Sequence, residues 1–326
     1  MGKQLSLRSR IAVALAFAAA GGVYCYVSLK ASGGPRPADD FTWHWLAARA
    51  LISGQNPYEI IKAGGIYQLD APYVYPLTTA VAAIPFAAFL TPALAAAVWI
   101  AVGTGLLAFA VTKHGWTQLL MFGSMPYLWA ANAAQISPIV TAAALLPWLG
   151  FITPIKPQIG IAALSYKPNR IAIAGAIAFV ILTLIVDPAW PKEWIAILPQ
   201  RVANVYRSPV TIMGGPILLL ALLRWRRADA RLLLVMSLVP QNMLFYDQLL
   251  LWLIPRTRNE LMILGTLSLV APLAASIGIG SAPDIAEVNR RYAPFILWLI
   301  YIPCLVIVLR RKNEACSLDP SPEPRT

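Results

Sequence analysis

Residues 93–111 read ALAAAVWIAVGTGLLAFAV and contain no charged side chain. A helix of this length, rising ~1.5 Å per residue, crosses the ~30 Å hydrocarbon core of a bilayer. Residues 11–29, 261–280 and 292–309 are equally long and equally free of charge. Backbone polar groups in lipid must be bonded within their own segment, so these stretches are predicted to be membrane-spanning helices.

The overall composition indicates the same class. Of the 326 residues, 59% are hydrophobic and 12% are charged, whereas soluble domains carry about 25% charged residues. We therefore predict an all-α polytopic integral membrane protein, a bundle of about ten to twelve transmembrane helices with amphipathic helices in its outer loops. Residues 1–312 are expected to form one domain, and residues 313–326, which contain three prolines, a disordered cytosolic tail.

Four further apolar stretches are expected to be helical. Residues 119–131, 139–152 and 171–186 are expected to be further spans. Residues 232–255 have arginines near both ends, so they are expected to form two short helices that turn near residues 240–242.

The net charge of +12 does not indicate a nucleic-acid partner, because the basic residues form short clusters between apolar segments. Such clusters mark cytosolic loops and predict that both termini are cytosolic. The three cysteines are scattered and the two histidines isolated, so neither a disulfide framework nor a metal site is implied. The basic clusters lie at residues 3–10, 224–231, 256–258 and 310–312.

The longest polar segment between two apolar ones is residues 39–58, DDFTWHWLAARALISGQNPY. With a cytosolic N-terminus, this segment lies outside the membrane. Asp39 and Asp40 are interpreted either as the N-cap of a helix over residues 41–52 or as a general base that takes a proton from a hydroxyl. The two interpretations are compatible, because a cap also fixes the carboxylate in place.

Cations of the later loops could hold an anionic group. Lys156 is either an interfacial lysine whose charge reaches the headgroups or a ligand for a phosphate. Arg201 and Arg207, in a second outer loop over residues 187–208, have the same two interpretations.

Asp247 is an acid within an apolar stretch, which is costly and therefore suggests function. Its alternative is a structural pair with Gln241, Asn242 or an arginine. Gln135 is interpreted as part of a site or as a polar bridge between helices. Tyr58 and Tyr75 are aromatic residues near the membrane surface, where anchoring the chain at the interface is the common role.

A series of short motifs resembles glycosyltransferase family 87, bacterial polyprenyl-phosphate-mannose-dependent α-mannosyltransferases of the GT-C superfamily. The motifs occur in order over most of the chain. They are DF and AARAL within residues 40–51, PY at 57–58, YVYPL at 73–77, IPF at 84–86, AQI at 134–136, KPQ at 156–158, WPKEW at 190–194 and the segment from Pro240 to YDQL at 246–249.

The resemblance implies a GT-C-like bundle in the bacterial plasma membrane, a polyprenyl-phosphate-linked sugar donor, a glycolipid or glycan acceptor, and no cofactor or metal. Asp40, with Asp39 beside it, would be the catalytic base. Two departures, His44 in place of an aromatic residue and a single proline after Tyr75, leave the sugar and the acceptor open. The donor phosphate would be bound by Lys156, Arg201 and Arg207, and the substrates by His44, Tyr58, Tyr75, Gln135, Gln158, Tyr246 and Asp247.

The main alternative is a multi-pass transporter or lipid flippase without transferase activity. A transporter needs polar residues along a route through the bundle, whereas most acids here fall in the predicted outer loops. Convergence of Asp40, Lys156 and Asp247 around one cavity would favour the enzyme.

Overall fold

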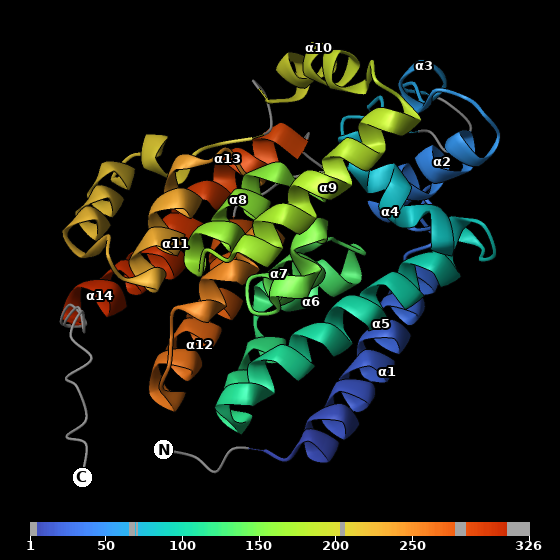
Figure 1. The fold of residues 1–326 in the computed structure, drawn as a ribbon. Helices are drawn as coiled ribbons and strands as arrows, with labels where there is room; N and C mark the ends of the chain where they lie inside the picture. The colour runs from blue at the N-terminus through green and yellow to red at the C-terminus, as the bar shows by residue number, and fades with distance from the viewer. Residues whose placement is uncertain (1–4, 65–68, 70, 203–205, 278–284, 312–326) are drawn as a thin grey trace, which may run out of the picture.

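The computed structural model describes residues 5–64, 69, 71–202, 206–277 and 285–311, and these are almost entirely helical (Figure 1). Among them the structure has no β-strand, only an isolated bridge between Arg207 and Gln241. The predicted all-α class is therefore confirmed.

Four helices of the described chain are long and apolar enough to cross a membrane. They are α1 (Leu7–Ser32), α5 (Pro92–Val111), α12 (Arg258–Ser276) and the continuous helix Ile285–Arg310. A fifth candidate is α9 (Arg170–Val186), joined to α10 by a bend of 100°. Four or five candidate spans are fewer than the ten to twelve predicted.

Proline explains much of the difference. The apolar residues 139–152 were expected to be one span, but the structure divides this region into two short helices, each with a proline in its first turn. Proline has no N–H and fixes φ, so it starts helices and interrupts long ones. The short α-helices are α2 (Phe41–Ile52), α3 (Pro57–Ile60), α4 (Leu77–Ala87), α6 (Met125–Asn132), α7 (Ser137–Ala143), α8 (Pro157–Tyr166), α10 (Trp190–Val202), α11 (Ala228–Leu238), α13 (Ile285–Ile296) and α14 (Ile302–Arg310).

Tighter or wider turns make up the remaining helical segments. The 3-10 segments are η1 (Thr112–His114), η2 (Trp116–Gly123), η3 (Pro147–Ile155), η4 (Pro209–Thr211), η5 (Gly215–Arg224) and η6 (Tyr246–Leu253), and η7 (Leu297–Tyr301) is one π-helical turn between α13 and α14. α11 and η6 are the two short helices expected within residues 232–255.

Small residues allow α1 and α5 to lie side by side along much of their length (Figure 1). A Cβ atom on Gly22 would lie 3.1 Å from the carbonyl oxygen of Ala97, and one on Gly105 would lie 3.0 Å from Cβ of Ala18. Small residues at a helix pair are the usual device for close packing in membranes.

The surface of α9 is rich in exposed aliphatic side chains. Such an apolar face would be unfavourable in water and is typical of a surface that meets lipid or another protein. The exposed fractions are 66% for Ile171, 56% for Ile177, 52% for Ile181 and 75% for Ile185.

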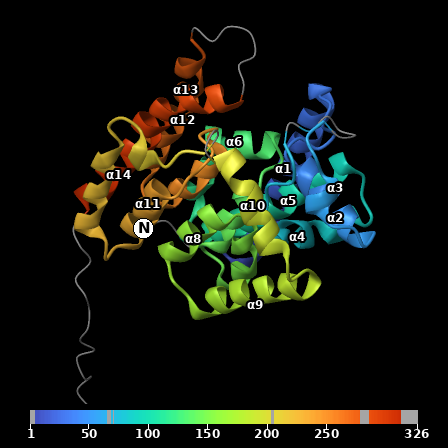
Figure 2. The same ribbon diagram turned by 90° about the horizontal axis from the view of Figure 1, so that it is seen from above.

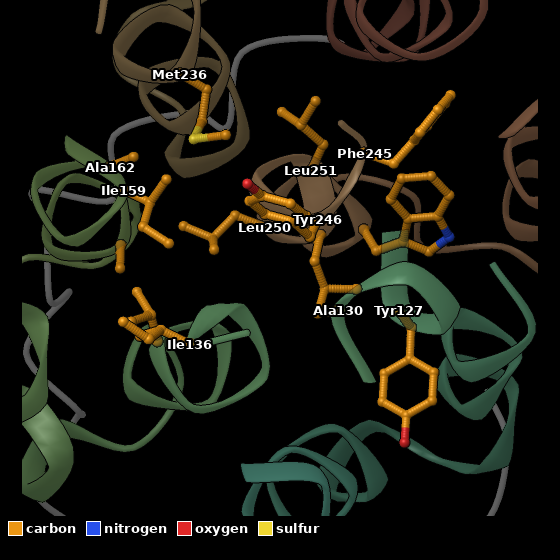
Figure 3. Close-up of a cluster of buried hydrophobic side chains, with 14 of the residues drawn as sticks. Tyr127, Ala130, Ile136, Ile159, Ala162, Met236, Phe245, Tyr246, Leu250 and Leu251 are labelled. Carbon is orange, nitrogen blue, oxygen red and sulfur yellow. The ribbon is translucent and has the colours of Figure 1, made fainter. Parts of the chain in front are cut away.

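The core is built around η6 and the residue that precedes it. Phe245, Tyr246, Leu250 and Leu251 lie among side chains of α6, α8 and α11 and Ile136, which precedes α7 (Figure 3). All four side chains are buried. All eight residues of η6 are buried, including the polar Asp247 and Gln248, so η6 lies inside the protein.

A second, smaller cluster joins α2, α3, α4 and α10. Trp43, Tyr58, Tyr73, Leu77 and Trp190 are its large buried members. α10 lies across the middle of the molecule when it is seen from above (Figure 2). The helix predicted over residues 41–52 is α2, and seven of its twelve residues are buried.

Basic residues from separate predicted cytosolic loops converge in the structure. Asp229 accepts from Arg227 at 3.0 Å and from Arg311 at 2.8 Å, and Arg311 also binds Glu260 at 2.8 Å. This charge network ties α11, α12 and the end of α14 together.

Candidate active site

Asp40 directly precedes α2, but its side chain makes no capping hydrogen bond, so the N-cap interpretation is wrong. The carboxylate binds other partners instead. Gln135 donates its side-chain amide to Oδ2, and Arg36 Nη1 lies 3.4 Å from Oδ1. Asp40 is therefore held by one amide and one cation from different parts of the chain.

Arg36 joins both acids. Its Nη2 atom lies 3.2 Å from Oδ1 of Asp39, and its guanidinium lies 5.1 Å from the ring centroid of Trp43. Asp39 has φ 44°, in the left-handed region. The sequence analysis missed Arg36, although its spacing of three and four residues from the two acids is the spacing of an ion pair within a turn.

Gln135 reaches Asp40 from the short connection between α6 and α7 and is 4% exposed. The preceding Ala134 has φ 50°, a conformation that favours glycine. This strained turn presents the amide of Gln135 to the carboxylate of Asp40.

Lys156 and Asp247 form a buried ion pair. Lys156 Nζ lies 2.5 Å from Oδ1 of Asp247, with the side chains 4% and 0% exposed. Asp247 Oδ2 also accepts from the backbone N–H of Asn242 at 3.1 Å. Of the partners expected for Asp247, Asn242 contacts it through its backbone N–H, while the charged partner is Lys156 and not an arginine. Lys156 Nζ also lies 4.7 Å from the ring centroid of Tyr246.

His44 lies one turn after Asp40 on α2 and is 3% exposed. Its ring meets that of Tyr75 edge-on, with centroids 4.3 Å apart. Its Nδ1 atom is buried and has no hydrogen-bond partner among the described residues. Burial, assisted by the charge of Lys156, lowers the pKa of His44 to about 3. The imidazole is therefore neutral at physiological pH.

A cavity of about 190 Å³ opens beside Lys156 and Tyr75. It is smaller than the ~300–1,000 Å³ typical of drug-sized ligands, which makes it suitable for one sugar-sized group. Tyr75, Trp194 and Tyr206 provide aromatic walls, and Trp194 is fixed by a hydrogen bond from Nε1 to the carbonyl of Val74 at 3.0 Å. The lining residues are Val74, Tyr75, Pro76, Ile155, Lys156, Pro157, Gln158, Trp194, Leu198, Tyr206 and Pro240.

A second hollow of about 230 Å³ shares Pro76 and Pro157 with this cavity. It lies between α4, η3, α8 and α9, and most of its lining residues are apolar. Trp190 borders it, and the indole Nε1 of Trp190 is buried without a partner in the described chain.

The structure brings together most of the predicted site residues. Tyr75, Lys156 and Gln158 line the cavity. Tyr246 lies within electrostatic reach of both Asp40 and Asp247, and it accepts from the Asn242 amide. These contacts place the Asp40 group and the Lys156 pair around the same aromatic side chains.

Other predicted residues are absent from the cavity lining, namely Asp39, Asp40, His44, Tyr58, Gln135, Arg207, Tyr246 and Asp247. Tyr58 contacts the wall residue Tyr75, since its hydroxyl donates a hydrogen bond to the carbonyl of Tyr75 at 2.9 Å. Arg207 is exposed, and it is the backbone of Arg207 that pairs with Gln241. Arg201 lies in α10, and its side chain is outside the described part of the structure, as is the predicted tail over residues 313–326.

The sequence analysis did not assign Trp194 and Tyr206 to the site, although both are aromatic residues of the predicted second outer loop. No group of three or more histidine, cysteine or acidic side chains in the described residues could hold a metal ion.

Comparisons of the chain with protein-family models, with curated proteins and with solved structures find no match. The function must therefore be inferred from the geometry of the site and from the motifs.

Proposed function

We propose that the protein is a membrane glycosyltransferase. It would transfer a hexose, mannose in the family that it resembles, from a polyprenyl-phosphate donor to a hydroxyl on the extracytoplasmic face. The proposal rests on a small cavity with aromatic walls that is lined by Lys156, the ion-pair partner of Asp247. The ring of Tyr246 lies next to Lys156 and within electrostatic reach of Asp40. An acid–base group, a cation and stacking surfaces are the parts that transfer from a lipid phosphate requires.

In the proposed reaction, Asp40 accepts the proton of the acceptor hydroxyl, and the hydroxyl oxygen bonds to the anomeric carbon of the donor sugar. The bond from that carbon to the phosphate oxygen breaks, and the lipid phosphate leaves with the electron pair. The amide of Gln135 and the guanidinium of Arg36 fix the carboxylate before substrate arrives. Such preorganisation is where much of the rate enhancement would arise.

Lys156 would act on the leaving group. The donor phosphodiester carries one negative charge, and the released phosphate monoester carries up to two. A nearby cation therefore stabilises the transition state more than the bound donor, as catalysis requires. In the resting protein Asp247 neutralises Lys156 and makes its burial tolerable.

The sugar would lie between the aromatic walls. Tyr75, Trp194 and Tyr206 can stack on the C–H face of a pyranose, and Gln158 can hydrogen-bond to its hydroxyls. The limited volume favours the transfer of a single sugar.

The alternative, a transporter or flippase, has one observation in its favour. Gln241, Gln248 and Tyr301 form a chain of buried polar groups within the helical bundle. These groups are fully buried and bonded to one another, and none of them lines either cavity. The enzyme is therefore preferred.

The test is sugar transfer in membranes from radiolabelled polyprenyl-phosphate-mannose. Asp40→Asn keeps the size of the side chain but removes the base. The matched control is Glu59→Gln, which neutralises an exposed acid of the same predicted loop. We expect the wild type and Glu59→Gln to transfer sugar and Asp40→Asn to lose at least 100-fold in rate, within the range attributed to general base catalysis.

Equal transfer by Asp40→Asn would remove the base from its role and leave the enzyme class standing. If neither the wild type nor the control transfers any lipid-phosphate sugar, the proposed function is rejected and transport becomes the preferred function.

A further inference from the structure

The segment between α11 and η6, residues 239–245, crosses the protein interior without forming a helix. It leads from the cavity wall at Pro240 to the ion pair at Asp247. Phe245 within it is 0% exposed and has φ 71°, a costly conformation for a residue with a side chain. Buried irregular backbone needs partners elsewhere, and these partners decide how the segment lies.

The backbone of this segment is bonded on three sides. Gln241 exchanges two backbone hydrogen bonds with Arg207, at 2.9 and 3.0 Å. The Asn242 N–H donates to Asp247, and the Met243 N–H donates to Oδ1 of Asn289 at 2.6 Å. The cavity wall next to Arg207, the ion pair and α13 are thus all attached to three consecutive residues.

The side chain of Gln241 is held in place by several hydrogen bonds. Its Oε1 atom accepts from the Tyr301 hydroxyl at 2.8 Å and from Gln248 Nε2 at 3.0 Å, and its amide donates to the carbonyl of Met236. Gln241, Gln248 and Tyr301 are each 0% exposed.

Tyr301 comes from a distant part of the chain. It is the last residue of the π-helical turn η7, which shifts the register between α13 and α14. Single π-helical turns inside α-helices are frequent at functional sites. Tyr301 lines neither cavity and does not contact the Lys156–Asp247 pair through any hydrogen bond in the described structure.

We propose that Tyr301 and Gln241 are positioning residues for the candidate site, a statement whose catalytic part rests on the proposed function. Tyr301 orients Gln241. The backbone of Gln241 holds Arg207 and with it the wall residue Tyr206, while the adjacent Asn242 N–H orients Asp247 and with it Lys156. The C-terminal helices thereby set the geometry of a site to which they contribute no contact residue.

A purely structural role makes a different prediction. If the network only satisfies buried polar groups, its loss lowers the amount of folded protein and leaves the folded fraction with normal kcat and KM. A positioning role lowers kcat in the folded fraction, since misplacing a reacting group is costly even when binding persists.

The decisive variant is Tyr301→Phe, which removes the hydroxyl and keeps the ring. Its matched control is Tyr166→Phe, another buried tyrosine, whose hydroxyl donates to the carbonyl of Leu253 at the other end of η6. We expect kcat of Tyr301→Phe to fall about tenfold, with KM for the donor changed less than threefold, the loss that corresponds to one hydrogen bond. The control should stay within twofold of the wild type.

A second readout does not depend on transfer. Tyr206→Cys, in a Cys316→Ser background, is labelled with a membrane-impermeant maleimide. We expect Tyr301→Phe to change the labelling rate of the cysteine at position 206 at least threefold and Tyr166→Phe to leave it unchanged. If Tyr301→Phe yields too little folded protein, Gln248→Leu removes the other donor to Gln241 and replaces it in both assays.

The outcomes separate the two proposals. Equal labelling rates in the Tyr301→Phe and Tyr166→Phe backgrounds would overturn the positioning role, whatever the transfer activity. Unchanged kcat in an active Tyr301→Phe protein would overturn it as well. A changed labelling rate, together with a wild type that transfers no sugar, would support the positioning role and reject the proposed function.

Discussion

Lys156 and Asp247 lie 91 positions apart in the chain and form an ion pair, with Nζ 2.5 Å from Oδ1, that is almost completely buried. Lys156 lies between η3 and α8, and Asp247 is in the first turn of η6. Burying two charges is costly unless each compensates the other. The pair therefore links two segments of the chain, and it holds the ammonium group of Lys156 beside the cavity.

The first prediction concerns this link. Asp247→Asn leaves Lys156 as an uncompensated buried charge and should reduce the free energy of unfolding by about 3–5 kcal/mol. The double variant Lys156→Met/Asp247→Leu should recover most of that loss, because no charge remains to be buried, but it should not recover transfer. Thermal unfolding in detergent together with the transfer assay checks both statements. A double variant as unstable as Asp247→Asn would contradict the assigned pairing.

The second prediction concerns the amide that holds the base. Gln135→Leu removes the hydrogen bond to Asp40 and should lower kcat about tenfold, while KM for the donor stays within threefold, because the carboxylate is retained but less well placed. Gln118→Leu is the control, since it removes another helix-bridging amide, one that donates to the carbonyl of Pro255 at 3.1 Å. Equal kcat values for the two variants would show that the Gln135 contact has no role in transfer.

The third prediction concerns backbone strain beside Gln135. Ala134 has φ 50°, which costs a residue with a Cβ atom roughly 1–2 kcal/mol. Ala134→Gly should therefore stabilise the protein, by up to about 1 kcal/mol after the greater flexibility of glycine in the unfolded chain is subtracted. Ala133, at φ −93°, provides the comparison. Ala133→Gly should destabilise by about 0.5–1 kcal/mol, so the two neighbouring substitutions should shift the unfolding midpoint in opposite directions.

The fourth prediction concerns pH. The pKa of His44 is lowered from 6.5 to about 3 in the folded protein, so the unfolded chain binds an additional proton between these values. Stability from the neutral, buried His44 is thus present above pH 6.5 and is lost as the pH falls toward 3, with a slope approaching about 1.4 kcal/mol per pH unit. His44→Phe preserves the ring contact with Tyr75 and should flatten the curve between pH 6.5 and 5, a range above the ordinary carboxyl pKa values. An identical slope in the variant would assign the effect to another group.

Local features of the chain were predictable. The amphipathic helix over residues 41–52, the apolar helix of residues 92–111 and the turn within residues 239–245 each follow from a short window of side chains. The N-cap interpretation of Asp40 failed because its carboxylate has stronger partners in Arg36 and Gln135. A local sequence pattern gives no information about hydrogen-bond partners that are distant in the sequence, such as Gln135.

The number of full spans was overestimated for a related reason. Composition identifies apolar segments, but Pro147 divides the apolar residues 139–152 between two short helices. How such fragments are then packed depends on the surrounding bundle.

By itself, the sequence determined the helical class and singled out candidate residues such as Asp40, Lys156 and Asp247, since apolar length, proline positions and isolated charges are properties of neighbouring residues. Only the tertiary structure decided that Asp40 meets Gln135, that Lys156 meets Asp247 and that Tyr301 holds Gln241. These contacts join residues 95, 91 and 60 positions apart. Helical hydrogen bonds and apolar periodicity act within a few residues, whereas the pairing of buried polar groups depends on which helix faces meet.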